Sequence, residues 1–164
     1  MRRLPAVAAL VAVTLIVGCR TSGRPLILAD ARAGREWYWP YFLDNKSTVV
    51  AFWDTESLAC IDSVPGLNTL NRLRTPVQLV SVATTPSARR LDACIRGQYR
   101  YPVEFVVLVD EKRRLAKKLD VTKYPTYIYF DQDGDEVART SDISKIDEWF
   151  RKEAWLRRSG AIRD

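Results

Sequence analysis

The sequence predicts an α/β domain in which a mixed central sheet is covered by helices on both faces. Three observations lead to this fold class. Apolar runs of strand length recur at residues 48–53, 77–83 and 105–109, as expected for strands that are buried on both faces. Segments with helical periodicity separate these runs, and a hairpin signal followed by one more helix closes the chain. The predicted order of these elements is therefore β-α-β-α-β-α-β-β-α.

The first two predicted helices each follow a buried strand. In residues 58–73 apolar side chains recur at every third position, although Pro65 predicts a kink or a late start. Residues 87–98 are expected to form the second helix, which ends near Gly97. Because helices that follow successive strands often alternate between the faces of such sheets, we expect these two helices to lie on opposite faces.

The last third of the chain predicts a helix, a hairpin and a final helix. A basic helix is expected over residues 111–119. Strands at residues 127–130 and 136–139 flank the sequence 131–135, in which the Asp-Gly pair is a strong hairpin signal. The final helix carries its apolar side chains on one face between residues 143 and 154.

The first 18 residues predict a targeting segment, not a part of the fold. A basic start is followed by the uncharged apolar run 4–18, which is shorter than the roughly 20 residues of a spanning helix. The sequence Ile-Val-Gly-Cys that ends at Cys19 resembles a bacterial lipobox. That resemblance implies a lipoprotein signal peptide over residues 1–18 and a lipidated Cys19 as the first mature residue. An uncleaved membrane anchor is the alternative.

These features divide the chain into a leader, a tether, one domain and a tail. Residues 19–34 mix Gly, Pro, Arg and Ser and are predicted to be a tether. The domain is expected over residues 35–158, with 159–164 as a C-terminal tail. Its aromatic first segment, 36–44, predicts a short helix or an irregular cap. The expected location is a bacterial membrane, with the domain facing the periplasm or the cell exterior.

Composition excludes several function classes. The chain has no histidine, which excludes Ser-His-Asp and Cys-His catalysis and histidine-ligated zinc. Too few ligands remain for a metal site, and no glycine loop is suited to phosphate, so no metal or other cofactor is predicted. The basic residues are scattered along the chain, which argues against a nucleic-acid partner.

Two thiols remain once Cys19 is lipidated, and they can pair in only one way. Cys60 lies where the first buried strand joins its helix, and Cys94 lies 34 residues further on. The positive end of a helix dipole favours the thiolate, so Cys60 is the first candidate nucleophile. The alternative is a buried and inert cysteine.

Four short motifs together resemble the thioredoxin fold. They are Phe52-Trp53, the turn that ends at Cys60, Tyr124-Pro125-Thr126 and the hairpin at Asp133-Gly134. With the lipobox, the chain looks most like the membrane-anchored TlpA/ResA kind of thiol–disulfide oxidoreductase. The resemblance implies that Pro125 is a cis-proline facing the turn, and that Tyr124 and Trp53 help bind the substrate. It also implies protein thiols or extended peptide segments as partners.

The chain departs from that family at the turn itself. Where the family has the first cysteine of Cys-x-x-Cys, this sequence has Ser57, and only Cys60 keeps a sulfur atom. Ala51 stands where an acidic residue is often found. Because serine cannot form a mixed disulfide, ordinary dithiol exchange at this turn is excluded.

Three interpretations stay open at this point. In the first, Cys60 and Cys94 form an unconventional redox pair, and Ser57 donates a hydrogen bond to the Cys60 thiolate. The predicted placement of the two helices works against this pair, because disulfide-bonded Cα atoms lie only about 4.4–6.8 Å apart.

The second interpretation is a thiol peroxidase. Ser57-x-x-Cys60 resembles the active turn of peroxiredoxins, and Cys94 falls near a resolving position of some members. However, Trp53 replaces the expected proline, and Pro125 stands where an arginine is expected. In the third interpretation the domain has lost catalysis and binds extended peptides beside Pro125 through main-chain hydrogen bonds.

Overall fold

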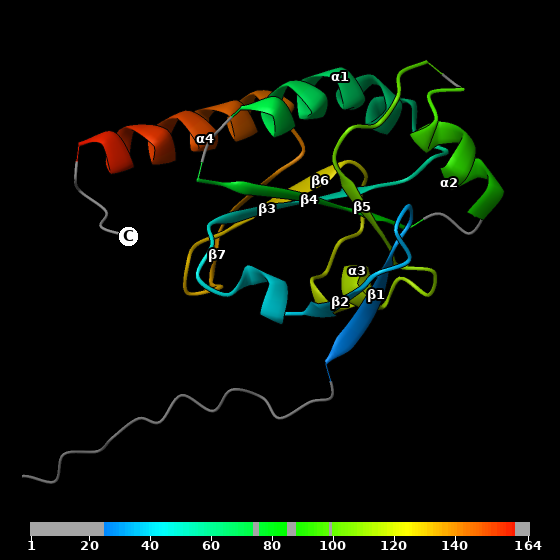
Figure 1. Cartoon of the computed structure of the whole chain (residues 1–164), viewed down its shortest axis with the longest axis horizontal. Helices are drawn as coiled ribbons and strands as arrows, with labels where there is room; N and C mark the ends of the chain where they lie inside the picture. Colours follow the sequence, from blue (N-terminus) through cyan, green and yellow to red (C-terminus); the bar gives the residue numbers. More distant parts are fainter. Residues whose placement is uncertain (1–24, 74–75, 85–87, 99, 160–164) are drawn as a thin grey trace, which may run out of the picture.

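The computed structural model describes residues 25–73, 76–84, 88–98 and 100–159 (Figure 1). Its centre is one seven-stranded mixed sheet in the order β2-β1-β5-β4-β3-β6-β7. The strands are β1 (Leu26–Asp30), β2 (Glu36–Trp39), β3 (Thr48–Trp53), β4 (Gln78–Ala83), β5 (Val106–Val109), β6 (Thr126–Phe130) and β7 (Glu136–Thr140). The helices are α1 (Leu58–Arg72), α2 (Ala88–Ile95), α3 (Arg114–Lys118) and α4 (Ile143–Arg158), with a short 3-10 helix η1 at Tyr41–Leu43. The predicted α/β class is confirmed.

The leader 1–18 and Cys19 lie outside the described residues. In the part of the chain that is described, no helix combines the length and the apolar character needed to cross a bilayer.

The two crossover helices α1 and α2 lie on the same face of the sheet, so the prediction of opposite faces is wrong. Strands β3, β4 and β5 are parallel and neighbour one another in chain order. Parallel crossovers are almost always right-handed, and two right-handed crossovers that step in the same direction place their helices on one face. Opposite faces would require the second crossover to step back past β3.

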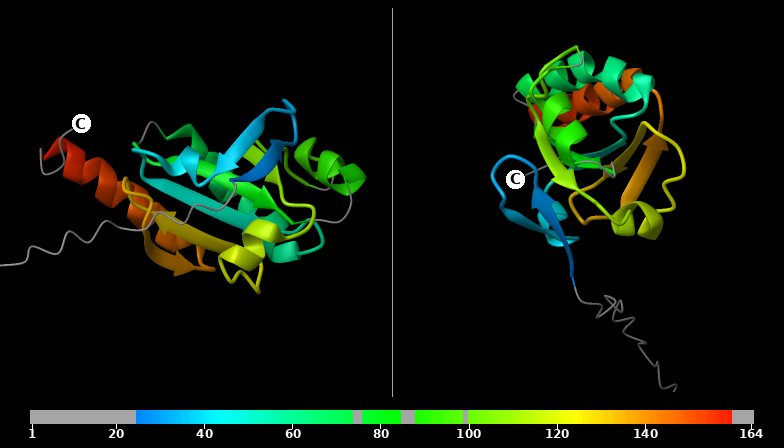
Figure 2. Two further views of the ribbon diagram at one scale, coloured as in Figure 1. Left: turned by 90° about the horizontal axis from the view of Figure 1, so that it is seen from below. Right: turned by 90° about the vertical axis from the view of Figure 1, so that its right-hand side faces the viewer.

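The sheet separates two apolar clusters. The first joins α1, α2 and α4 to the sheet and includes Val64, Leu91 and Phe150. The second lies on the other face, where Leu28 of β1, Trp39 of β2 and Leu115 of α3 pack against the alternate strand residues. Figure 2 shows α1 and α4 on one side of the sheet and α3 with the hairpin β1–β2 on the other.

The hairpin β1–β2 corrects the predicted tether over residues 19–34. Within that range Leu26–Asp30 forms a strand, which pairs with β2 and, through Ala29 and Asp30, with β5. Leu28 is buried in the second cluster, and this burial stabilises a strand whose flanking Gly, Pro and Arg residues predicted only a linker. The domain therefore begins by residue 26, and residues 36–44 form β2 and η1 instead of one helix or cap.

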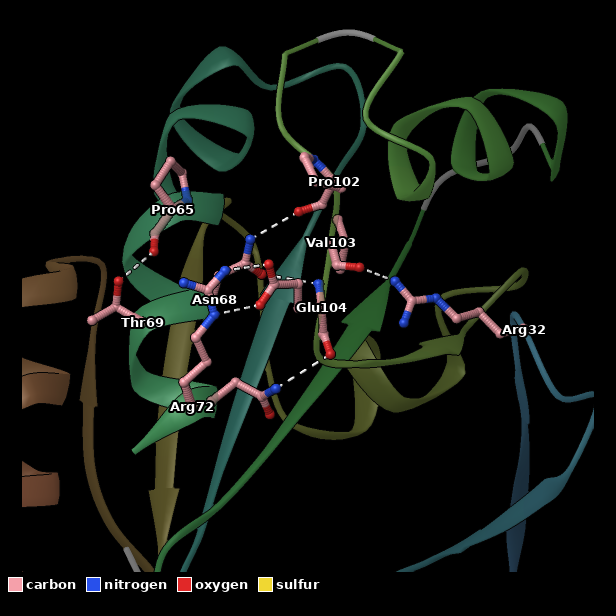
Figure 3. Close-up of polar contacts among 9 residues, drawn as sticks. Arg32, Pro65, Asn68, Thr69, Arg72, Pro102, Val103 and Glu104 are labelled. Atoms are coloured by element: carbon pink, nitrogen blue, oxygen red, sulfur yellow. Dashed lines mark hydrogen bonds and ion pairs between the residues drawn. The ribbon is translucent and has the colours of Figure 1, made fainter. Parts of the chain in front are cut away.

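Helix α1 contains Pro65 and is nevertheless assigned as one helix from Leu58 to Arg72. One turn further along it, Asn68 is buried and holds the connection between α2 and β5. Its Nδ2 donates to the carbonyl of Pro102 at 2.8 Å, and its Oδ1 accepts from the backbone N–H of Glu104 at 2.9 Å (Figure 3). A single side chain thus replaces the backbone partners that this connection lacks.

Further contacts fasten the same connection at its surface. Arg72 forms an exposed ion pair with Glu104, and Arg100 pairs with Asp62. The Arg32 guanidinium of the hairpin turn donates to the carbonyl of Val103 (Figure 3). The two exposed ion pairs contribute little to stability, so the hydrogen bonds of the buried Asn68 amide stabilise this connection more than these pairs do.

We expect Asn68→Ala to lower the free energy of unfolding by about 2 kcal/mol, because it removes the two hydrogen bonds that the buried Asn68 side chain makes to the backbone of Pro102 and Glu104. Urea denaturation measures this change. Asn71→Ala is the matched control, since Asn71 is exposed and donates only one bond, to the carbonyl of Glu104. An equal loss in both variants would contradict the role assigned to Asn68.

Candidate thiol site and the adjoining groove

Cys60 is the third residue of α1, and its side chain is only 1% exposed. The backbone N–H of Asp54, in the turn after β3, donates to its Sγ at 3.5 Å. Burial raises the pKa of the Cys60 thiol above its usual range; hydrogen bonds from Ser57 and Asp54 lower it by less. The helix start alone predicted a stabilised thiolate, but desolvation outweighs that effect.

Ser57 is the N-cap residue of α1, yet its hydroxyl makes no capping hydrogen bond. The Ser57 carbonyl accepts from the N–H groups of Cys60 and Ile61, which begins the helix. The hydroxyl instead hydrogen-bonds the Cys60 thiol and lowers its pKa. Glu56, just before it, forms an exposed ion pair with Arg90 of α2.

Cys94 is the second to last residue of α2 and is 2% exposed. It belongs to the same apolar cluster as Cys60 and Trp53. Burial raises the pKa of Cys94, and the charge of a Cys60 thiolate raises it further. The structure therefore brings the two thiols into one buried region, with both of them free.

Gly97 ends the α2 region in a conformation that few other residues adopt. Its φ is +76°, and a Cβ atom at this position would lie 2.7 Å from the backbone nitrogen of Pro102. The turn at Gly97 thus returns the chain to the segment that Asn68 holds, and so fixes the end of the helix that carries Cys94.

Tyr124 and Pro125 form one wall of a groove beside Cys60. The peptide bond between them is cis. Pairing of Phe52 with Thr126 places this loop at the edge of the sheet where β3 ends. The groove measures about 540 Å³ and runs between α1, the loop and the start of α4. Its lining residues are Ala59, Asp62, Ser63, Lys123, Tyr124, Pro125, Tyr127, Ser141, Asp142 and Ile143.

Two buried polar atoms near the thiols have no hydrogen-bond partner among the described residues. They are Nε1 of Trp53 and Oη of Tyr127. Burial raises the pKa of Tyr127 to about 12. The sequence reasoning missed Tyr127. Strand alternation contained the signal, because residues 125 and 127 share a face.

Comparison with solved structures identifies the architecture. A DsbF protein of Mycobacterium tuberculosis superposes with a TM-score of 0.68 at 21% identity, over 80% of this chain and 94% of that one. This chain has a thioredoxin-like fold. A secreted M. tuberculosis disulfide oxidoreductase homologous to E. coli DsbE gives a TM-score of 0.66 at 15% identity, over 77% and 95% of the two chains.

A third thioredoxin-like structure is the exposed lipoprotein thioredoxin of Streptococcus pneumoniae. Its TM-score is 0.64 at 18% identity, with 78% of this chain and 98% of that chain covered. No protein-family model matches the sequence, and no curated protein is significantly similar to it. At these identities the superpositions show the fold alone.

Alkylation of native Cys60 should be slow at neutral pH and accelerate as the pH rises through its raised pKa, because only the thiolate reacts. Ser57→Ala should shift this rate profile to higher pH, since it removes a hydrogen bond that lowers the pKa. Iodoacetamide labelling followed by mass spectrometry between pH 6 and about 10.5 measures the profile. Ser144→Ala, in the first turn of α4, serves as the control. A profile centred below pH 8 would contradict the dominance of burial.

Proposed function

We propose that this chain is a lipid-anchored, extracytoplasmic relative of thiol–disulfide oxidoreductases whose redox chemistry is carried by Cys60 and Cys94. The observation that carries the proposal is the burial of both thiols in one apolar cluster, to which Tyr124 and Tyr127 of the groove also belong. Sequence reasoning counted the placement of the two helices against this pair. Their common face answers the part of that objection that rested on opposite faces of the sheet.

The proposed reaction is an exchange between the protein dithiol and a substrate disulfide. A Cys60 thiolate attacks one sulfur of the substrate, forms a mixed disulfide and releases the first substrate thiol. The Cys94 thiolate then attacks Sγ of Cys60, forms the Cys60–Cys94 disulfide and releases the second substrate thiol. Two electrons pass to the substrate, and the two protons lost by the protein thiols end on the substrate thiols.

Access to the thiols requires a local opening, because both side chains are almost fully buried. The turn that contains Ser57 is linked to α2 by the exposed pair Glu56–Arg90, which adds little to stability. Separation of this turn from α2 would expose Cys60. In the proposal Ser57 occupies the position of the missing first cysteine and stabilises the Cys60 thiolate through its hydroxyl.

The remaining parts of the proposal concern location and substrate. Cys19 carries the lipid, so the domain faces the periplasm or the cell exterior, where protein disulfides persist. Protein thiols on extended segments would lie in the groove against Tyr124 and Pro125, whereas Trp53 is buried and does not line the groove. The names of the similar structures, which include a secreted disulfide oxidoreductase and an exposed lipoprotein thioredoxin, support this assignment.

A peroxidase is less well supported than a disulfide exchanger. Rapid reaction with peroxide needs an accessible thiolate, and burial raises the pKa of Cys60. The same burial favours a second candidate function, in which the groove only binds extended segments. Leu58, at the start of α1, is 76% exposed and would offer such a segment an apolar contact.

Oxidation of the full chain with excess dithiodipyridine should remove both buried thiols and link Cys60 to Cys94. Thiol counting and non-reducing peptide mapping detect the link. Cys94→Ala should abolish it and leave a mixed disulfide on Cys60 instead. Separate adducts on Cys60 and Cys94 in the unsubstituted chain would contradict the redox pair and favour the binding function.

Ser57→Cys should create disulfide exchange at the turn, because it supplies a half-buried sulfur at the start of α1, one helical turn from Cys60. We expect insulin reduction to rise by about tenfold or more. Ala59→Cys is the matched control, since it adds an exposed thiol to the same turn without the Cys-x-x-Cys spacing. Equal activity of the two variants would argue against a thiol–disulfide scaffold at this groove.

A further inference from the structure

The face opposite the thiol cluster carries an unusual concentration of positive charge. Five basic residues fall within residues 112–118, whereas the whole chain has a formal net charge of +6. Arg113 donates to the hydroxyl of Tyr124 at 2.9 Å and so belongs to the groove loop. The other four are exposed, and we call them the basic face: Lys112, Arg114, Lys117 and Lys118.

The charges of the basic face are not neutralised within the described part of the chain. None of its four side chains takes part in the ion pairs found among the described residues. Glu36 and Glu111 line a surface hollow together with Lys112 and Arg114, and Asp120 follows the basic face in the sequence. Lys117 and Lys118 do not line this hollow. Asp110 is buried and accepts the first N–H groups of α3, so it is already used.

The basic face lies beside the first strand of the domain. The Arg114 guanidinium donates to the carbonyl of Ile27 at 3.4 Å, and Ile27 lines the same hollow as Lys112. Only six residues separate Cys19 from Leu26, the first residue of β1. A chain of that length spans at most about 25 Å. A lipid at Cys19 would therefore keep this strand, and with it the basic face, close to the bilayer.

Aromatic side chains border the basic face on the hairpin side. Tyr38 is 39% and Tyr41 61% exposed, and both line a hollow with the half-buried Trp37 and Phe42. Trp and Tyr favour the interface between headgroups and hydrocarbon. Figures 1 and 2 show α3, β2 and η1 together on the side of the sheet away from α1 and α4.

We propose that this face, formed by α3 and the hairpin β1–β2, docks on a bilayer surface that carries anionic headgroups. The inference rests on the proposed lipid at Cys19, which supplies the proximity, while the uncompensated charge supplies the attraction. Docking fixes the orientation of the domain: α1 and α4 point away from the bilayer. The α1 wall of the groove then stays open to substrates in solution.

The test is lysine labelling of the full chain, purified with whatever is attached at Cys19 and reconstituted into vesicles. One set contains phosphatidylcholine alone and the other contains phosphatidylcholine with phosphatidylglycerol. We expect the anionic lipid to slow acylation of Lys112, Lys117 and Lys118 by about fivefold, the factor for roughly one charge at such a surface. Lys152 of α4 is the internal control and should label equally on both sets.

High salt and lysine substitutions test whether the protection depends on charge. Protection should disappear in 1 M salt, because the headgroup attraction is screened. Lys117→Gln with Lys118→Gln should remove the protection of Lys112, whereas Lys145→Gln with Lys152→Gln should leave it intact. Equal labelling of α3 and α4 lysines on anionic vesicles would overturn the docking, as would equal protection on neutral vesicles.

Flotation of the same samples separates this inference from the proposed function. A chain that floats with the vesicles but labels evenly overturns the docking alone. A chain that does not float with anionic vesicles overturns both the docking and the anchor. Neither readout depends on Cys60 or Cys94, so the thiol experiments stand independently.

Discussion

The direction in which the parallel strands cross the sheet determines where both thiols lie. Because β3, β4 and β5 neighbour one another in chain order, their right-handed crossovers put α1 and α2 on one face. Cys60 and Cys94 therefore share a cluster. If the second crossover had stepped the other way, Cys94 would have been placed on the face that Leu115 covers. The order of the strands, and not the sequence of the turn before Cys60, therefore allows Cys60 and Cys94 to be considered as a redox pair.

The buried amide of Asn68 complements this constraint. Strand order decides the face on which α2 lies, but the connection from α2 to β5 has no sheet partner for its first residues. Asn68 supplies those partners by bonding Pro102 and Glu104, and Gly97 provides the turn that brings the chain there. The position of Cys94 thus depends on one satisfied polar side chain within an apolar cluster. Removing either the buried amide or one of its hydrogen-bond partners lowers the free energy of unfolding.

Local pattern predicted the central strands and helices because their periodicity is a property of neighbouring residues. The strand Leu26–Asp30 was missed because the Gly, Pro and Arg residues around it predicted a linker, and because its pairing with Val109 joins residues about eighty positions apart. The common face of α1 and α2 depends on strand order, which periodicity does not specify. The sequence located Cys60 at a helix start but contained no measure of its depth. Tyr127, by contrast, was available from strand alternation after Pro125.

Strand β3 links the two faces of the molecule, and its alternation keeps their chemistries apart. Ala51 and Trp53 point into the thiol cluster, whereas Val50 and Phe52 point into the cluster beneath α3 and the hairpin. A slip of one residue in β3 would exchange these sets, so its register is strongly specified by two apolar faces. Burial that is deep enough to raise the pKa of Cys60 is a consequence of this arrangement. The same depth that suppresses the thiolate at rest would also keep the Cys60 thiol out of contact with unselected disulfides.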